Sequence, residues 1–306
     1  MRGALSLLDA IDVTALDDKQ RTSVSKMRAR FDEAPRDDAH DLPPVAADIL
    51  AAYRNYWRDA MLRRKTQAEC EQELLAALRT ILPGEPGADL DAVSDAARGA
   101  IEACGLHALT GVTLPYHELM IWRRSTPTSH RIALPEQDVD VTVVFLDEFV
   151  SLGWAAYATG DRSHTGGWAT PTELYAVRQA YDVEAESFRV SYLAHEGQHF
   201  ADYRRFPRLE SPELEYRAKL TELALSTDTT RDLVATFAQR TGGERSVPHH
   251  FAHRHLVRNL SRALGVGNVT HASAEAIRTA ARALLVASSH ELEARGAAKV
   301  ERWLGD

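Results

Sequence analysis

Residues 191–203 read Ser191-Tyr-Leu-Ala-His195-Glu196-Gly197-Gln198-His199-Phe-Ala-Asp202-Tyr203 and contain the pattern His-Glu-x-x-His within a helical periodicity. On a helix, positions i and i+4 lie on one face, so His195 and His199 can both reach one Zn²⁺ ion. Glu196 follows the first histidine and is placed to act as a general base toward an attacking water. Apolar and small neighbours fit a helix buried in a cleft. The stretch therefore predicts an active-site helix with a catalytic zinc site.

A catalytic zinc site takes three protein ligands and leaves the fourth position open. The position six residues after His199, where the metzincin pattern has its third histidine, is Arg205 in this chain. Both cysteines, Cys70 and Cys104, lie in the predicted helical N-terminal region, so they are poor candidates. The remaining common solution is a glutamate from the next helix.

The next helix is predicted over Pro212–Leu225, because Ser211 can cap it and proline suits its first turn. It carries three candidate carboxylates, Glu213, Glu215 and Glu222. Helical spacing alone leaves all three open as the third ligand.

His-Glu-x-x-His followed by a helix with Glu-x-x-Ala resembles the gluzincin metallopeptidases, the broad group of thermolysin and neprilysin. The segment Glu215-Tyr-Arg-Ala218 is similar to the third-ligand segment of the membrane CaaX-processing proteases. The resemblance covers residues 166–225. It implies a zincin fold, zinc bound by His195, His199 and Glu215, general-base catalysis by Glu196, and peptide-bond hydrolysis.

One position departs from the gluzincin pattern. That pattern often has an aspartate four residues after the ligand glutamate, which orients one of the histidines, whereas this chain has Lys219 there. Asp202 is the alternative source of an orienting carboxylate.

The order of predicted elements is helices, then strands, then helices. Helices are expected over 46–64, 67–82, 89–104, 183–204, 212–225, 231–240, 250–264 and 273–292, and strands over 113–122, 131–134, 139–146 and 154–159. This order predicts a mostly helical α+β protein. We expect a helical N-terminal region over 1–110 and a zincin-like metallohydrolase domain with a small mixed or antiparallel sheet over 111–306. The aromatic residues Tyr53, Tyr56 and Trp57 are expected in the core of the N-terminal region.

Two further segments bear on the site. Residues 164–168, His-Thr-Gly-Gly-Trp, precede the motif helix and fit either an edge strand able to pair with a peptide backbone or a simple turn. A histidine cluster, His249, His250, His253 and His255, lies downstream. Gluzincin-like sites commonly add a downstream histidine or tyrosine that stabilises the oxyanion, and the sequence does not choose among these four.

Composition limits the class of protein. The net charge of −8 argues against a nucleic-acid partner. Two cysteines cannot form a disulfide framework, and two separate thiols are favoured over a Cys70–Cys104 pair. Neither a signal peptide nor a membrane span is recognisable, so the location is cytoplasmic by default, or exported with the signal removed. The alanine- and arginine-rich texture suggests a bacterial source, and the oligomeric state stays open.

The sequence thus predicts a zinc metallopeptidase that acts on a peptide or protein. Two alternatives remain: a zincin-fold protein that binds a partner without cleaving it, and a non-peptidase metal-dependent hydrolase on the same scaffold.

Overall fold

The computed structural model describes residues 12–32, 41–82, 84, 88–170, 172–296 and 302–305. The N-terminal run on which the signal-peptide prediction depends lies outside these ranges, except for its end at Asp12. The chain divides into two compact units. Unit 1 comprises 1–126 and 146–166, and unit 2 comprises 127–145 and 167–306. The boundary at residue 110 stays a sequence prediction.

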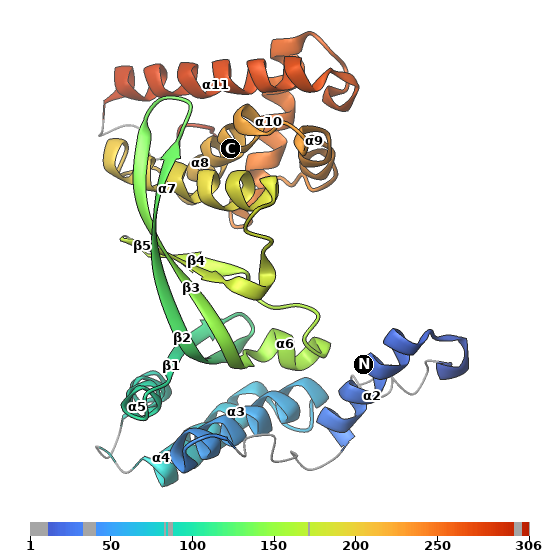
Figure 1. Ribbon diagram of the computed structural model, residues 1–306, viewed down its shortest axis with the longest axis vertical. Helices are drawn as coiled ribbons and strands as arrows, with labels where there is room; N and C mark the ends of the chain where they lie inside the picture. The colour runs from blue at the N-terminus through green and yellow to red at the C-terminus, as the bar shows by residue number, and fades with distance from the viewer. Residues whose placement is uncertain are drawn as a thin grey trace. The chain divides into compact units, whose positions relative to one another are not determined.

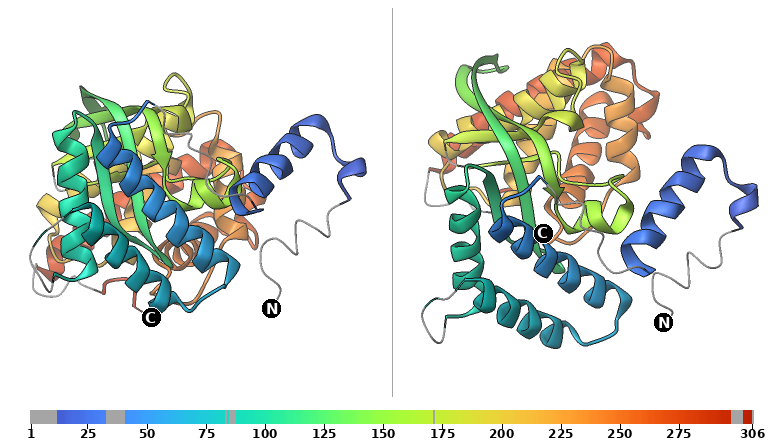
Figure 2. Two further views of the ribbon diagram at one scale, coloured as in Figure 1. Left: turned by 90° about the horizontal axis from the view of Figure 1, so that it is seen from below. Right: turned by 60° about the horizontal axis from the view of Figure 1, so that its bottom comes forward.

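Unit 1 combines helices with part of the sheet. Its elements are α2 (Asp18–Asp32), α3 (Pro44–Leu62), α4 (Gln67–Ile81), α5 (Leu90–Ala103), β1 (His107–Thr113), the first part of β2 (Tyr116–Ala133), the last part of β3 (Asp138–Leu152), and α6 (Trp154–Thr159). Figure 2 shows α3, α4 and α5 following one another along the chain as successive helices. Tyr53, Tyr56 and Trp57 are buried in the core of this unit, as predicted. Cys70 and Cys104 are both free thiols, which confirms the preferred prediction.

Unit 2 contains the motif. Its elements are the last part of β2 and the first part of β3 with the turn between them, β4 (Gly167–Ala169), β5 (Glu173–Val177), the π-helix η3 (Phe188–Ala194), α7 (His195–Arg205), α8 (Ser211–Leu225), α9 (Thr230–Gln239), α10 (Pro248–Leu264) and α11 (Ala274–Arg295). Helix α8 packs against α7, α10 and α11 (Figure 1). Its buried apolar residues form one hydrophobic core with those of α9, α10 and α11. Both segments that carry predicted ligands are therefore anchored in one unit.

One sheet joins the strands β1 to β5, in the order β1-β2-β3-β5-β4, with β2 spanning Tyr116–Ala133 and β3 spanning Asp138–Leu152. Strands β4 and β5 are antiparallel, with Trp168 opposite Tyr175. The protein is thus mostly helical with a small mixed sheet, which agrees with the predicted α+β class. The segment 164–168 contributes two residues to β4, and β4 is the last strand at that end of the sheet.

Two local predictions were wrong. Residues 154–159 form helix α6 and not a strand, because Gly153 turns the chain with φ +89° and the Glu118 carboxylate accepts a hydrogen bond from Trp154 N (2.9 Å). A short apolar run is equally compatible with either structure. Residues 123–130, which separate the predicted strands 113–122 and 131–134, belong to the single strand β2, which joins the two. Strand β1 pairs with β2 only as far as Trp122, so the proline at 127 lies beyond the β1 ladder.

The predicted helix 183–204 begins later and is not uniform. Its first part is the π-helix Phe188–Ala194, which changes to α geometry at His195. Gly197, between the two histidines, faces the hairpin: a Cβ there would lie 3.1 Å from Ile132 Cδ1 and 3.3 Å from Val139 Cγ2. A glycine therefore allows α7 to lie close against β2 and β3.

Among the described helices, none combines the length and apolar character that crossing a bilayer requires.

The start of α9 depends on one carboxylate upstream of the π-helix. Glu186 accepts hydrogen bonds from the backbone N–H groups of Asp228 (2.9 Å) and Thr229 (2.7 Å), and from the Thr227 hydroxyl. Burial acts to raise the pKa of Glu186, but these hydrogen bonds outweigh it and lower the pKa to about 2. The Glu186 carboxylate thereby supplies hydrogen-bond acceptors for backbone N–H groups just before α9.

We expect Glu186→Gln to lower the free energy of unfolding near neutral pH by about 1 kcal/mol, the size of a lost helix cap on a half-exposed group. Because the folded pKa is depressed, the stabilisation is full above the unfolded value of about 4.3 and is lost as pH falls toward 2. Urea unfolding between pH 2.5 and 7 measures this difference. The exposed neighbour Glu184 provides the control Glu184→Gln; a pH-independent loss for Glu186→Gln would contradict the assignment.

Candidate metal centre

Three side chains predicted as zinc ligands meet in the structure. His195 and His199 project from one face of α7, and their Nε2 atoms lie 3.1 Å apart. Glu215, from the middle of α8, places Oε2 3.6 Å from His195 Nε2 and Oε1 3.5 Å from His199 Nε2. All three side chains are largely buried, and together they form a group that could hold a metal ion.

The spacing of these atoms fits a tetrahedral ion. Ligand atoms about 2.0–2.1 Å from a tetrahedral zinc lie about 3.3 Å from one another. The two Nε2 atoms lie 3.1 Å apart, close to that value, and each has one oxygen of Glu215 at a similar distance: Oε2 is 3.6 Å from His195 and Oε1 is 3.5 Å from His199. Two neutral imidazoles and one carboxylate are also a donor set that zinc prefers, so the residues present fit the ion.

The other two candidate glutamates have different partners. Glu213 is fully buried and binds Arg245 Nη2 through both carboxylate oxygens (2.8 and 2.7 Å). Glu222 lies on the opposite side of the His195 ring, where its Oε1 is 2.7 Å from Nδ1. Of the three carboxylates on α8, Glu215 is thus the one that faces both Nε2 atoms.

Asp202, the predicted orienting carboxylate, pairs with Gln198 and Arg217 and not with a histidine, so that prediction was wrong. The carboxylate in contact with a histidine Nδ1 is Glu222. Asp202 accepts hydrogen bonds from Gln198 Nε2 (2.9 Å) and Arg217 Nε (2.8 Å). It stands three residues after His199, on the part of α7 that faces Arg217. The sequence pattern indicated Glu222 only as a candidate ligand, although its spacing of seven residues from Glu215, two helical turns on the same face, was a usable signal.

The charges around the histidines act on their pKa values in opposite directions. Burial and the nearby Lys219 ammonium lower the pKa of His195, although Glu222 opposes them. Burial also acts to lower the pKa of His199, but the Glu215 carboxylate outweighs it and raises the pKa. Burial alone would raise the pKa of Glu215, yet the neighbouring histidines hold it far below its usual range. Glu215 is therefore an anion beside the two imidazoles.

Glu196, the predicted general base, is half-buried on the next position of α7. Three tyrosines lie within reach of its charge. Burial, with a contribution from Glu196, raises the pKa of Tyr181 to about 12 and also raises the pKa values of Tyr192 and Tyr203. The ring of Tyr203 lies 6.3 Å from that of His199, and Tyr203 is half exposed. The Glu196 charge thus acts on the hydroxyl groups of all three tyrosines.

The structure separates the four histidines of the downstream cluster. His249, near the N-terminus of α10, is 60% exposed and places Nδ1 2.7 Å from Glu215 Oε2. His253 stacks on Phe237 and His255 packs against Phe251, each with ring centroids 4.6 Å apart. His250 is exposed. Among these four, His249 is the one in contact with the three-residue group.

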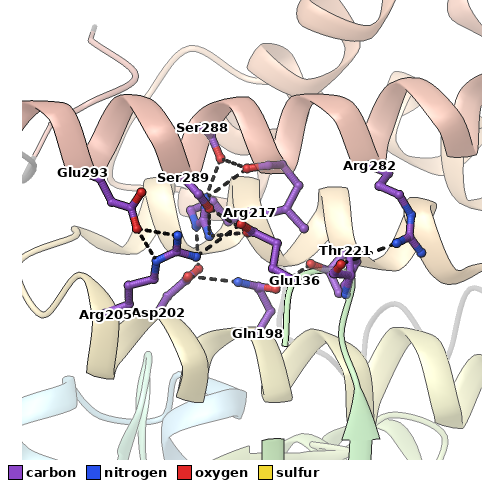
Figure 3. A network of polar contacts seen from close by, with 12 residues as sticks. Glu136, Gln198, Asp202, Arg205, Arg217, Thr221, Arg282, Ser288, Ser289 and Glu293 are labelled. Carbon is purple, nitrogen blue, oxygen red and sulfur yellow. Dashed lines mark hydrogen bonds and ion pairs between the residues drawn. The ribbon is translucent and has the colours of Figure 1, made fainter. Parts of the chain in front are cut away.

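A buried polar network holds α7 and α8 in register (Figure 3). Arg217, two residues after Glu215, is fully buried and pairs with Asp202. Its Nη2 also donates to the Ser289 hydroxyl of α11 (3.1 Å) and lies 3.6 Å from Glu136 at the β2–β3 turn. Gln198 adds a second link, because its Oε1 accepts from the Thr221 hydroxyl (2.8 Å). The network ties the helices that carry the histidines and the glutamate to one another.

A scan against protein-family models, a search of curated proteins and a search of solved structures each found no match to this chain.

Proposed function

We propose that the protein is a zinc-dependent metallopeptidase. The observation that carries the proposal is the convergence of His195 Nε2, His199 Nε2 and Glu215 at separations of 3.1–3.6 Å, with Glu196 beside them. Among the described residues the group comprises three, which is the number of protein ligands in catalytic zinc sites, whereas structural sites use four. This favours an enzyme over a protein that only binds a partner.

When bound, Zn²⁺ would polarise a carbonyl oxygen and lower the pKa of water. The residues of the chain supply the remaining functions. Glu196 takes the proton of the attacking water and passes it to the departing amine nitrogen. His249, whose Nδ1 lies 2.7 Å from Glu215 Oε2, is the residue we propose as the hydrogen-bond donor to the developing oxyanion, through its other ring nitrogen. The buried Asp202–Arg217 pair keeps the two helices in place during this reaction.

The edge strand supports a peptide as the substrate. Among the described strands β4 is the last in the sheet, and strand addition at a sheet edge is a common mode of peptide recognition. Gly167 brings β4 close to β5, since a Cβ there would lie 2.1 Å from Tyr175 O. The same carbonyl accepts a hydrogen bond from Tyr192 OH (2.8 Å), and Tyr192 stands three residues before His195. The strand pair is thus tied to the helix that carries the motif.

Metal analysis tests the proposal directly. We expect the purified protein to bind about one zinc ion per chain and to cleave peptides in a chelator-sensitive manner. His195→Ala and His199→Ala should each lose the zinc, while His250→Ala, which changes an exposed histidine outside the group, should retain it. Zinc retention in both of the first two variants would refute the site. Cleavage of small esters or amides but of no peptide in a peptide library would favour the non-peptidase alternative.

A further inference from the structure

We propose that Glu222 and Lys219 form a positioning pair that fixes His195 for metal binding, replacing the aspartate expected four residues after Glu215. The inference rests on the proposed metal site. Glu222 is 1% exposed, and its Oε1 lies 2.7 Å from both His195 Nδ1 and Lys219 Nζ. One carboxylate oxygen therefore serves the imidazole and the ammonium together.

The first function of Glu222 is to select the tautomer of His195. A carboxylate beside Nδ1 favours a proton on that nitrogen, which leaves the lone pair on Nε2. Nε2 is the atom that faces His199 and Glu215. The same hydrogen bond restrains rotation of the imidazole ring, so Nε2 is already oriented toward the metal position in the metal-free protein.

The function of Lys219 follows from charge. Its side chain is largely buried, with Nζ 3.4 Å from His195 Nδ1 and 5.4 Å from the centre of the Phe237 ring. An ammonium this close to a cation site would repel the metal if it were unpaired. Paired with Glu222, it forms a neutral unit, and the carboxylate is held in place by a second contact from the same helix.

The two histidines differ in whether a carboxylate contacts Nδ1. His199 Nδ1 is buried and has no hydrogen-bond partner in the described part of the chain. Among the two imidazoles, His195 is therefore the one whose orientation is set by a carboxylate. Loss of Glu222 should accordingly weaken metal binding through His195.

The experiment compares the zinc affinity of four proteins stripped of metal with a chelator: wild type, Glu222→Gln, Glu222→Leu, and Lys219→Met/Glu222→Leu. A chromophoric chelator competes for Zn²⁺ during titration. We expect Glu222→Leu to bind zinc about 10–100-fold more weakly than wild type, the usual effect of losing such a partner. Glu222→Gln keeps an acceptor for Nδ1–H and should lose less. The double variant should be tighter than Glu222→Leu, because the unpaired ammonium is gone, but still weaker than wild type.

Two readouts separate positioning from a general structural role. The unfolding free energy of each metal-free protein shows whether the fold is intact, and the visible spectrum of the Co²⁺ form reports the ligand geometry. Zinc affinity within twofold of wild type in Glu222→Leu would overturn the inference. If Glu222→Leu does not fold, the double variant Lys219→Met/Glu222→Leu, which has no unpaired buried charge, takes its place. A zinc affinity of the double variant within twofold of wild type then overturns the inference.

A failure of the proposed metal site can be distinguished from a failure of the positioning pair. If His195→Ala retains wild-type zinc, the metal site itself is wrong. If His195→Ala loses zinc while the Glu222 variants bind it normally, only the positioning pair is wrong.

Discussion

Glu196→Gln is expected to bind zinc as tightly as wild type and to lose about 10²–10⁴-fold in kcat for peptide hydrolysis. The amide has nearly the same shape as the carboxylate but cannot accept a proton. Glu196 is not among the three residues that converge, so its replacement leaves the metal-binding atoms in place. Metal content per chain and steady-state kinetics on one cleaved peptide measure the two effects.

A matched control comes from the glutamates of the same region. Glu184→Gln makes the same chemical change at an exposed position upstream of the π-helix and should leave kcat unchanged. Full peptidase activity in Glu196→Gln would show that another group takes the proton. Loss of zinc in that variant would instead show that Glu196 contributes to metal binding.

Arg217→Met is expected to lower the free energy of unfolding by about 3–5 kcal/mol, the second large effect. The change leaves the buried Asp202 carboxylate, 2.8 Å from Arg217 Nε in the native protein, without its cation. Burial raises the pKa of Asp202 and Arg217 opposes that rise, so the carboxylate becomes costly to keep charged when the guanidinium is removed. Equilibrium unfolding in urea, followed by far-UV circular dichroism, measures the loss.

The chain offers two controls for this experiment. Glu293→Gln removes an ion pair with Arg205 whose side chains are 31% and 50% exposed, and should cost less than about 1 kcal/mol. The double variant Arg217→Met/Asp202→Leu removes both buried charges and should recover much of the stability. A loss for Arg217→Met no larger than that for Glu293→Gln would mean that the pair does not stabilise the fold.

The sequence predicted those parts of the site that depend on local geometry. The i, i+4 spacing places His195 and His199 on one face of any regular helix, and the structure has them on one face of α7. The start of the helix carrying Glu215 was also predicted within one residue, because Pro212 suits a first turn. The predicted cap was wrong, since Ser211 is the first helical residue and Glu210 stands at the N-cap position. The class, mostly helical α+β, followed from the order of periodic segments.

The parts that depend on packing could not be predicted. Which glutamate faces the imidazoles is decided by how α8 lies against α7, and helical periodicity says nothing about that rotation. Asp202 was misassigned for the same reason, since its partner Arg217 is on the other helix. The strand predicted at residues 154–159 is helical because a hydrogen bond to Glu118, 36 residues earlier in the chain, starts a helix there.

The π-helix ahead of the motif sets the angular phase between the residues before His195 and those after it. A wider turn holds more residues, so Tyr192 is rotated away from the direction that an α-helix would give it relative to His195. This rotation lets one continuous backbone serve two surfaces, with the Tyr192 hydroxyl on the β5 carbonyl and the imidazoles on the neighbouring helix α8. Removing one residue from 188–194 would therefore leave a helix there. It would rotate Tyr192 relative to His195, so that the two side chains could no longer reach β5 and α8 at the same time.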